Sequence, residues 1–190
     1  MEKEQAIKIF KESNALLDGH FRLTSGLHSP QYFQCAKVLQ YPEYTEQLAK
    51  VIVDYYQNQN IECVISPAVG GIVIGQEVAR LLGCRHIFAE RENNEMTLRR
   101  GFEFKKGERI LAVEDVVTTG GSIKEVIKLA QNNDAIVIGA GFIVDRSAGK
   151  TTFDVPHFSV MQMDVIVYNP DECPLCKKDI PVVKPGSRKI

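Results

Sequence analysis

The sequence has no excess of charge of either sign, and this excludes several classes of function. Its 23 Lys and Arg residues almost balance its 24 Asp and Glu residues, which gives a net charge of -1. A protein that binds nucleic acid through a global basic field needs a surplus of positive charge. We therefore expect no nucleic-acid partner. With 44% hydrophobic residues, the composition is typical of a globular protein.

Long apolar runs are also missing. No stretch approaches the roughly 20 consecutive apolar residues that span a bilayer, and the N-terminal sequence MEKEQAIKIF lacks the apolar core of a signal peptide. Internal repeats and low-complexity tracts are absent as well. We expect a cytoplasmic protein that does not associate with membranes and whose residues 1–190 form a single domain.

Cysteine is scarce, and its odd count of five argues against a disulfide framework. Cys35, Cys63 and Cys84 lie in or beside apolar segments and are expected to be reduced thiols. Cys173 and Cys176 form the motif CPLC, which is half of a zinc-ribbon pattern, but no second CxxC and no nearby CxxH completes it. No metal ligand is predicted, although a site shared between subunits stays open for this pair.

From Ile61 onward, short apolar strands alternate with helices of about a dozen residues. The expected strands are Ile61–Ile65, 84–90, 109–115 and 135–145, and the expected helices are 71–82 and 122–133. This alternation is typical of right-handed crossover units. The sequence therefore predicts an α/β fold with a mostly parallel central sheet flanked by helices.

The N-terminal part does not follow this alternation. Residues 2–17 predict an amphipathic helix that ends at Gly19, and residues 42–58 predict another helix with a proline in its first turn. We expect three parts within the one domain, namely a small hood (about residues 1–40), a core (about 41–168) and an irregular tail (169–190), part of which joins the hood.

The segment RILAVEDVVTTGGS, residues 109–122, ends a buried strand with two acids and continues into a loop of small polar residues. Backbone N–H groups at the start of the following helix, together with the loop hydroxyls, form a cradle for a phosphate. The spacing matches neither a Walker A loop nor G-x-G-x-x-G. Glu114 and Asp115 would repel that phosphate unless they serve another group, such as a ribose diol or a hydrated Mg²⁺. A phosphorylated sugar is the predicted ligand, and an ordinary strand end and turn is the alternative.

The stretch ILAVEDVVTTGGS resembles the phosphoribosyl-diphosphate signature of the type I phosphoribosyltransferases. FRLTSGLHSPQYF, SPAVGGIVIGQEVAR, FAERENNEMTLRRGF and CPLCKKDIPVVKPGSR are similar to the orotate branch of that family, and together they cover about residues 21–188. The resemblance implies transfer of the phosphoribosyl group of 5-phosphoribosyl 1-diphosphate (PRPP) to orotate, which gives orotidine 5'-monophosphate and pyrophosphate in UMP biosynthesis. It also implies a homodimer and a requirement for Mg²⁺, held mainly through PRPP and water.

The resemblance further implies a PRPP site built from two loops. Val117 to Gly121 would hold the 5'-phosphate, the two acids would face the ribose hydroxyls, and SPAVGG, residues 66–71, would lie under the pyrophosphate with an unusual peptide geometry. The implied PRPP-binding residues are Glu114, Asp115, Val116, Val117, Thr118, Thr119, Gly120, Gly121, Ser122, Val69, Gly70 and Gly71.

For the base, the resemblance implies that Arg146 pairs with the orotate carboxylate, because a guanidinium fork binds a planar carboxylate through two hydrogen bonds. Thr118 would also reach the base, and Tyr32 and Phe33 of the hood would lie near its ring. The alternatives are a surface cation for Arg146 and ordinary core packing for the two aromatic residues.

The polar stretch RENNEMTLRRG, residues 91–101, is similar to the mobile loop that closes over the diphosphate in this family. Closure excludes water from the reacting carbon. Arg91, Arg99 and Arg100 would stabilise charge on the departing pyrophosphate, and with Asp115 they are the predicted catalytic residues. A solvated hairpin is the alternative for this stretch.

Two other functions stay open. A phosphoribosyltransferase that acts on another nucleobase would give Arg146 no anionic partner. A non-catalytic regulator that senses PRPP should carry an added DNA-binding domain or a basic face, and the sequence shows neither.

Overall fold

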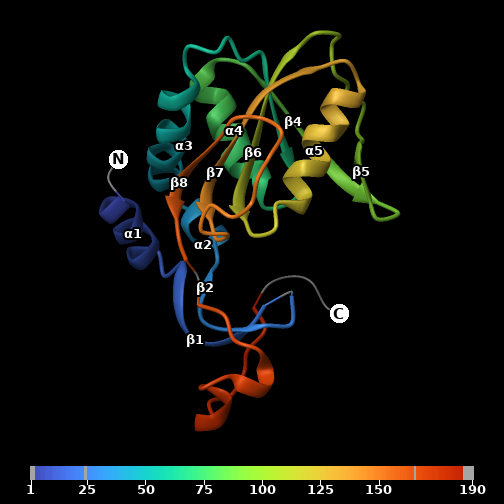
Figure 1. Ribbon diagram of the computed structural model, residues 1–190. Helices are drawn as coiled ribbons and strands as arrows, with labels where there is room; N and C mark the ends of the chain where they lie inside the picture. The colour runs from blue at the N-terminus through green and yellow to red at the C-terminus, as the bar shows by residue number, and fades with distance from the viewer. Residues whose placement is uncertain (1–2, 24, 165, 186–190) are drawn as a thin grey trace.

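The structure is a computed structural model that describes residues 3–23, 25–164 and 166–185. Its core is a six-stranded sheet with the order β5-β4-β3-β6-β7-β8, in which neighbouring strands are parallel except for the antiparallel pair β4 and β5. A separate antiparallel hairpin, β1–β2, lies below this sheet in Figure 1. The predicted α/β fold with a mostly parallel central sheet is confirmed.

The elements have the following bounds. The strands are β1 (Leu16–Arg22), β2 (His28–Phe33), β3 (Cys63–Pro67), β4 (Arg85–Glu92), β5 (Glu95–Leu98), β6 (Arg109–Val117), β7 (Ile136–Asp145) and β8 (His157–Gln162). The helices are α1 (Lys3–Glu12), α2 (Ala36–Leu39), α3 (Pro42–Tyr56), α4 (Gly71–Leu82) and α5 (Gly121–Asn132), followed by the 3-10 turns η1 (Pro170–Glu172) and η2 (Cys176–Lys178). None of the helices in the described ranges is long and apolar enough to cross a membrane.

The central strands carry long apolar runs because both faces of the sheet are covered. Successive strand residues point to opposite faces. Val64, Leu111 and Val113 pack in the cluster that includes α1, α3 and α4, whereas Ile65 and Ala112 pack in the cluster that includes α5. Figure 1 shows α3 and α4 on one side of the sheet and α5 on the other. Burial on both faces is typical of parallel sheets.

The N-terminal helix is shorter than predicted. The prediction extended it to Gly19, but α1 ends at Glu12 and Leu16 already begins β1. Ser13 Oγ donates a hydrogen bond of 2.8 Å to the carbonyl of Ile9, and Asn14 has a φ of 51°, so the chain leaves the helix there. The apolar residues after this turn therefore belong to the hood hairpin.

The tail lies against the hood hairpin. His28 and Tyr168 exchange two backbone hydrogen bonds of 2.9 and 2.8 Å, and Val183 receives one from Arg22 and donates one to His20. Two short 3-10 turns interrupt the otherwise irregular tail. Residues 1–2 and 24 of the predicted hood and residues 186–190 of the predicted tail lie outside the described residues.

His86 on β4 makes the stability of the core sensitive to acid. Its Nε2 lies 3.2 Å from Ser66 Oγ, and burial lowers the pKa of His86 to about 4. An unfolded histidine titrates near pH 6.5, so the unfolded chain binds more protons than the folded chain between these values. The free energy of unfolding is therefore expected to fall as the pH is lowered from about 6.5 toward 4.

The His86→Gln variant tests this expectation. Glutamine keeps a hydrogen-bonding group but does not titrate, so urea unfolding at pH 7 and pH 5 should show a smaller loss of stability than in the wild type. The exposed His157 on β8 offers a matched control as His157→Gln. If both variants lose the same free energy as the wild type between the two pH values, His86 does not carry the effect.

Candidate active site

Three predicted segments meet at the carboxyl edge of the sheet. β3, β6 and β7 are parallel neighbours, so the loops that follow them leave from the same edge. Val117 pairs with Asp145, and the backbone N–H of Arg146 donates a hydrogen bond of 2.8 Å to the Val117 carbonyl. This edge faces the hood hairpin in Figure 1. The acid pair, the segment 66–71 and Arg146 are thereby collected at one place.

The segment 66–71 lies directly against the acid pair. A Cβ on Gly70 would lie 2.8 and 2.9 Å from the two carboxylate oxygens of Asp115, so only glycine permits this approach. The peptide bond between Ala68 and Val69 is cis, which is the unusual peptide geometry that the resemblance implied. Val69 is 81% exposed and Gly70 is exposed, so this part of the segment is accessible to a ligand.

The phosphate loop has the form that an anion cradle requires. Gly120 precedes α5 with a φ of 75°, and no side chain in the described part of the chain caps the helix start. Thr118, Thr119 and Gly121 are exposed, and Ser122 is half-buried. Free N–H groups at a helix start and exposed hydroxyls are suited to bind a phosphate. Val116 and Val117 pack their side chains against the two core clusters, so only their backbone groups can face a ligand.

Arg146 presents an unpaired polar group in a largely buried position. Burial lowers the pKa of its guanidinium. Its Nε is fully buried and has no hydrogen-bond partner among the residues that the structure describes. The guanidinium carbon lies 5.9 Å from the centre of the Tyr32 ring, which is within cation–π distance. A buried charged donor without an acceptor is unfavourable, and an anionic ligand would supply that acceptor.

Tyr32 of the hood and Asp115 of the core share one electrostatic environment. Burial raises the pKa of Asp115, and the N–H of Val116, 2.9 Å from Oδ1, acts in the opposite direction. Burial also raises the pKa of Tyr32, which Arg146 lowers and Asp115 raises. The hood thus brings Tyr32 to the same site as the acid pair and the arginine.

Phe33 does not join this site. It follows Tyr32 on β2 and points to the other face of the strand, where it is 4% exposed and packs edge-on against Phe10 at 5.7 Å between ring centres. The side chain of Phe33 thus packs in the core in this structure, and its place near the base stays a prediction.

The predicted mobile loop is a regular β-hairpin in this structure. β4 and β5 pair from Ala89–Leu98 to Glu92–Glu95. The turn between them is Asn93-Asn94, with φ values of 48° and 66°. Two left-handed turn residues are typical of a tight hairpin, and asparagine adopts this conformation more readily than most residues.

The three loop arginines are paired with carboxylates instead of facing Asp115. Arg100 binds Glu90 through two hydrogen bonds of 2.8 and 2.9 Å. Arg91 lies 2.7 Å from Glu125 of α5, and Arg99 lies 3.7 Å from Glu92. The structure therefore does not bring Arg91, Arg99 and Arg100 together with the acid pair.

The sequence reasoning missed the segment that supports the phosphate loop. Thr151 Oγ1 donates a hydrogen bond of 3.0 Å to the carbonyl of Thr118, and a Cβ on Gly120 would lie 2.7 Å from Thr151 Cγ2. The buried Asp145 holds the intervening turn by accepting hydrogen bonds from Ser147 and Gly149. The small and polar residues after the strand end VDR were the available signal for this turn.

The comparisons with known proteins agree with this geometry. Residues 36–168 match the family model described as the phosphoribosyl transferase domain. The chain belongs to the phosphoribosyltransferase family. A curated relative, the orotate phosphoribosyltransferase of Caldanaerobacter subterraneus subsp. tengcongensis, is 54% identical over 190 residues, which is the full length of both chains. The resemblance to the orotate branch is confirmed.

Solved phosphoribosyltransferases share the fold. The orotate phosphoribosyltransferase of Aeropyrum pernix has a TM-score of 0.71 at 25% identity, over 82% of this chain and 92% of that one. The adenine phosphoribosyltransferase of Rhodothermus marinus has a TM-score of 0.64 at 20% identity, over 84% and 99% of the two chains. Phosphoribosyltransferases that are named for different nucleobases thus share one architecture, so the fold does not identify the base. The base has to be inferred from the residues of the site.

Proposed function

We propose that this phosphoribosyltransferase transfers the 5-phosphoribosyl group of PRPP to orotate, with release of pyrophosphate, in pyrimidine biosynthesis. The observation that carries the proposal is Arg146, whose buried Nε has no acceptor within the described part of the chain. Orotate brings a carboxylate that a guanidinium fork can bind, whereas adenine and uracil carry no such group. The full-length relatives named orotate phosphoribosyltransferase support the same base.

The proposed PRPP site uses three groups of atoms. The N–H groups and hydroxyls of the loop from Thr118 to Ser122 bind the 5'-phosphate. Glu114 and Asp115 accept hydrogen bonds from the ribose hydroxyls. The segment with the exposed Val69 and Gly70 and the buried Gly71 lies under the pyrophosphate. Because the Asp115 carboxylate lies directly against Gly70, sugar and leaving group would be held in a fixed relation.

In the proposed reaction, the bond from the anomeric carbon to the pyrophosphate oxygen breaks and a bond to the orotate ring nitrogen forms. Positive charge develops on the ribose in between, so catalysis depends on positioning and electrostatics and needs no side-chain nucleophile. Arg146 binds one end of the orotate base and so orients the base. Thr118 also contacts the base. Tyr32 lies beside the guanidinium of Arg146.

We also propose that Arg91, Arg99 and Arg100 act on the departing pyrophosphate after the β4–β5 hairpin moves. Their present partners do not prevent this, because the three arginine side chains are 35%, 50% and 60% exposed. Exposed ion pairs contribute only about 0–1 kcal/mol each. An incoming diphosphate, with its higher charge, is the better partner for these guanidinium groups.

The proposal includes Mg²⁺ as cofactor, one domain over the whole chain, a homodimer and a cytoplasmic location. The donor set fits Mg²⁺, since the carboxylates of Glu114 and Asp115 and the phosphates of PRPP are hard oxygen ligands. When bound, the ion supplies neutralising charge for the diphosphate. Sedimentation analysis tests the dimer.

The test of the function is a panel of nucleobases. The protein is incubated with PRPP, Mg²⁺ and either orotate, uracil, adenine or hypoxanthine, and pyrophosphate release is measured. Among the four bases, we expect pyrophosphate release only with orotate. Release with another base instead would favour the alternative enzyme, and binding of PRPP without turnover of any base would favour a regulator.

A further inference from the structure

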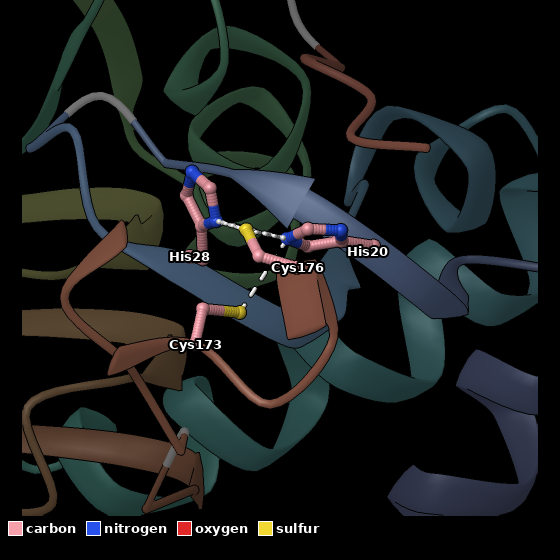
Figure 2. Close-up of side chains that lie close together, drawn as sticks. All are labelled: His20, His28, Cys173 and Cys176. Atoms are coloured by element: carbon pink, nitrogen blue, oxygen red, sulfur yellow. Dashed lines mark hydrogen bonds between the residues drawn. The ribbon is translucent and has the colours of Figure 1, made fainter. Parts of the chain in front are cut away.

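Four side chains from distant parts of the chain converge outside the active site. His20 lies on β1, His28 lies on β2, Cys173 follows η1 and Cys176 lies on η2. One ligand atom from each lies within 4.8 Å of the other three. Figure 2 shows these groups turned toward one another. Three of the four residues are buried and Cys176 is half-buried.

The strand register places the two histidines on one face of the hairpin. Arg22 pairs with His28, and His20 Nε2 lies 2.8 Å from His28 Nδ1, so the two side chains meet on one side of the hairpin. The register shifts between Asp18 and Phe21, where β1 contains one more residue than the facing stretch of β2. Such a bulge re-aims side chains, and here it accompanies a close approach of two imidazole rings, with 4.7 Å between their centres.

The distances between the ligand atoms suit a small tetrahedral ion. His20 Nε2 lies 3.5 Å from Cys173 Sγ and 3.7 Å from Cys176 Sγ, and His28 Nδ1 lies 3.3 Å from Cys176 Sγ. Bond lengths of about 2.3 Å for Zn–S and 2.0–2.1 Å for Zn–N imply ligand separations of roughly 3.3–3.8 Å. The two nitrogens, 2.8 Å apart, would separate by about 0.5 Å to receive the ion.

The surroundings hold His20 in the tautomer that a metal requires. Its Nδ1 lies 2.7 Å from the carbonyl oxygen of Ile180. A carbonyl only accepts, so Nδ1 carries the proton and donates it there, and Nε2 presents its lone pair to the cluster. A metal-bound histidine commonly donates its second N–H to a carbonyl in this manner, which orients the ring.

We propose that His20, His28, Cys173 and Cys176 bind a Zn²⁺ ion in a closed structural site. Two sulfur and two nitrogen ligands in a tetrahedron are typical of zinc, and four protein ligands leave no open position for substrate. The CPLC motif is thus completed within the same chain, by histidines 153 and 148 residues away in sequence. The site shared between subunits is not needed.

The ion links the tail to the hood hairpin. An isolated two-stranded hairpin is marginally stable in water, and this one carries Tyr32 to the active site. Binding of Zn²⁺ to the folded state alone stabilises that state. The site therefore holds the hood in the position that places Tyr32 beside Arg146.

Metal analysis of the whole protein is the first test. The chain is purified without chelators under reducing conditions, and its zinc content is measured by inductively coupled plasma mass spectrometry. We expect about one zinc per chain, and less than a tenth of that for Cys173→Ser and Cys176→Ser. Cys84→Ser is the matched control, since Cys84 is a half-buried free cysteine outside the cluster and should leave the zinc content unchanged.

Cobalt titration keeps the proposal testable if a serine variant fails to fold. The wild-type protein is stripped of metal and titrated with Co²⁺, and we expect the intense visible bands of tetrahedral cobalt with thiolate charge transfer, displaced by added Zn²⁺. Limited proteolysis of the stripped protein should cut the hood and tail first and leave the core intact.

Three results would overturn the proposal. The first is wild-type protein that has no zinc and shows no tetrahedral cobalt bands. The four side chains would then be only a hydrogen-bonded histidine pair beside two thiols. The second is a zinc-free protein whose intact mass shows a disulfide between Cys173 and Cys176. The third is an equal loss of zinc in the Cys84→Ser control.

Discussion

Replacing Arg146 with alanine is expected to weaken orotate binding by about 30-fold to several hundred-fold, while PRPP binding stays within a few-fold of the wild type. Removing one partner of a buried charge pair costs about 2–4 kcal/mol, and each 1.4 kcal/mol is a factor of ten. In this variant the orotate carboxylate would lose its guanidinium partner. In the proposed site PRPP would bind at the neighbouring loops and would lose no contact. Calorimetric titration with each substrate measures the two affinities separately.

The Arg146→Lys variant separates charge from shape. Lysine retains the positive charge but cannot make the paired hydrogen bonds of a guanidinium fork. Its orotate affinity should therefore lie between those of the alanine variant and the wild type. Equal losses of orotate and PRPP affinity in Arg146→Ala would contradict the assignment of the base to Arg146.

Neutralising the acid pair is expected to remove catalysis without unfolding the protein. In the double variant Glu114→Gln and Asp115→Asn, the ribose hydroxyls lose two charged acceptors, each worth about 1.5–3 kcal/mol. PRPP affinity should drop by at least about 100-fold, and turnover should fall with it. Isothermal titration and pyrophosphate release give the two measurements.

The thermal stability of the single variant Asp115→Asn should not fall. Burial raises the pKa of Asp115, so the ionised carboxylate is disfavoured in the folded state and a neutral amide of equal size removes that cost. A Tm equal to or above that of the wild type is the expected result. Turnover at the wild-type rate in the double variant would refute the assignment of the acids to the ribose.

The core of the fold could be predicted from the sequence because local sequence patterns indicate its helices and strands. α3 and α4 occupy the ranges that the apolar spacing predicted, and Gly83 ends α4 in the left-handed conformation, with a φ of 70°. β6 and β7 were visible as apolar runs because they are buried on both faces. In such elements the intrinsic propensity of the residues, the apolar pattern and the residues at the ends all predict the same structure.

The edge strands of the sheet could not be predicted from the sequence in the same way. β8 and β5 are edge strands, partly exposed and polar, so their sequences HFSVMQ and EMTL lack a long apolar run. The stretch around Asn93-Asn94 was interpreted as a loop because its polar character outweighed the alternation of Met96 and Leu98. The turn residues were the signal that favoured a hairpin.

The active-site prediction depends on contiguous residues, because contacts between distant residues cannot be inferred from a local pattern. The loop from Glu114 to Ser122 is one stretch, and a phosphate cradle can be inferred from its composition. Whether Tyr32 or Phe33 faces the site depends on which side of β2 points to the core, and that is set by packing against Phe10. The pairing of His20 with Cys176 likewise requires the tertiary fold.

The hairpin β1–β2 makes backbone hydrogen bonds with Tyr168 and Val183, and this fixes an order of events during protein synthesis. The hairpin (residues 16–33) is synthesised more than 130 residues before Tyr168 and Val183, so it leaves the ribosome without these partners and with His20 and His28 uncovered. The hairpin that carries Tyr32 therefore obtains its full set of backbone partners only after the chain has been made beyond Val183.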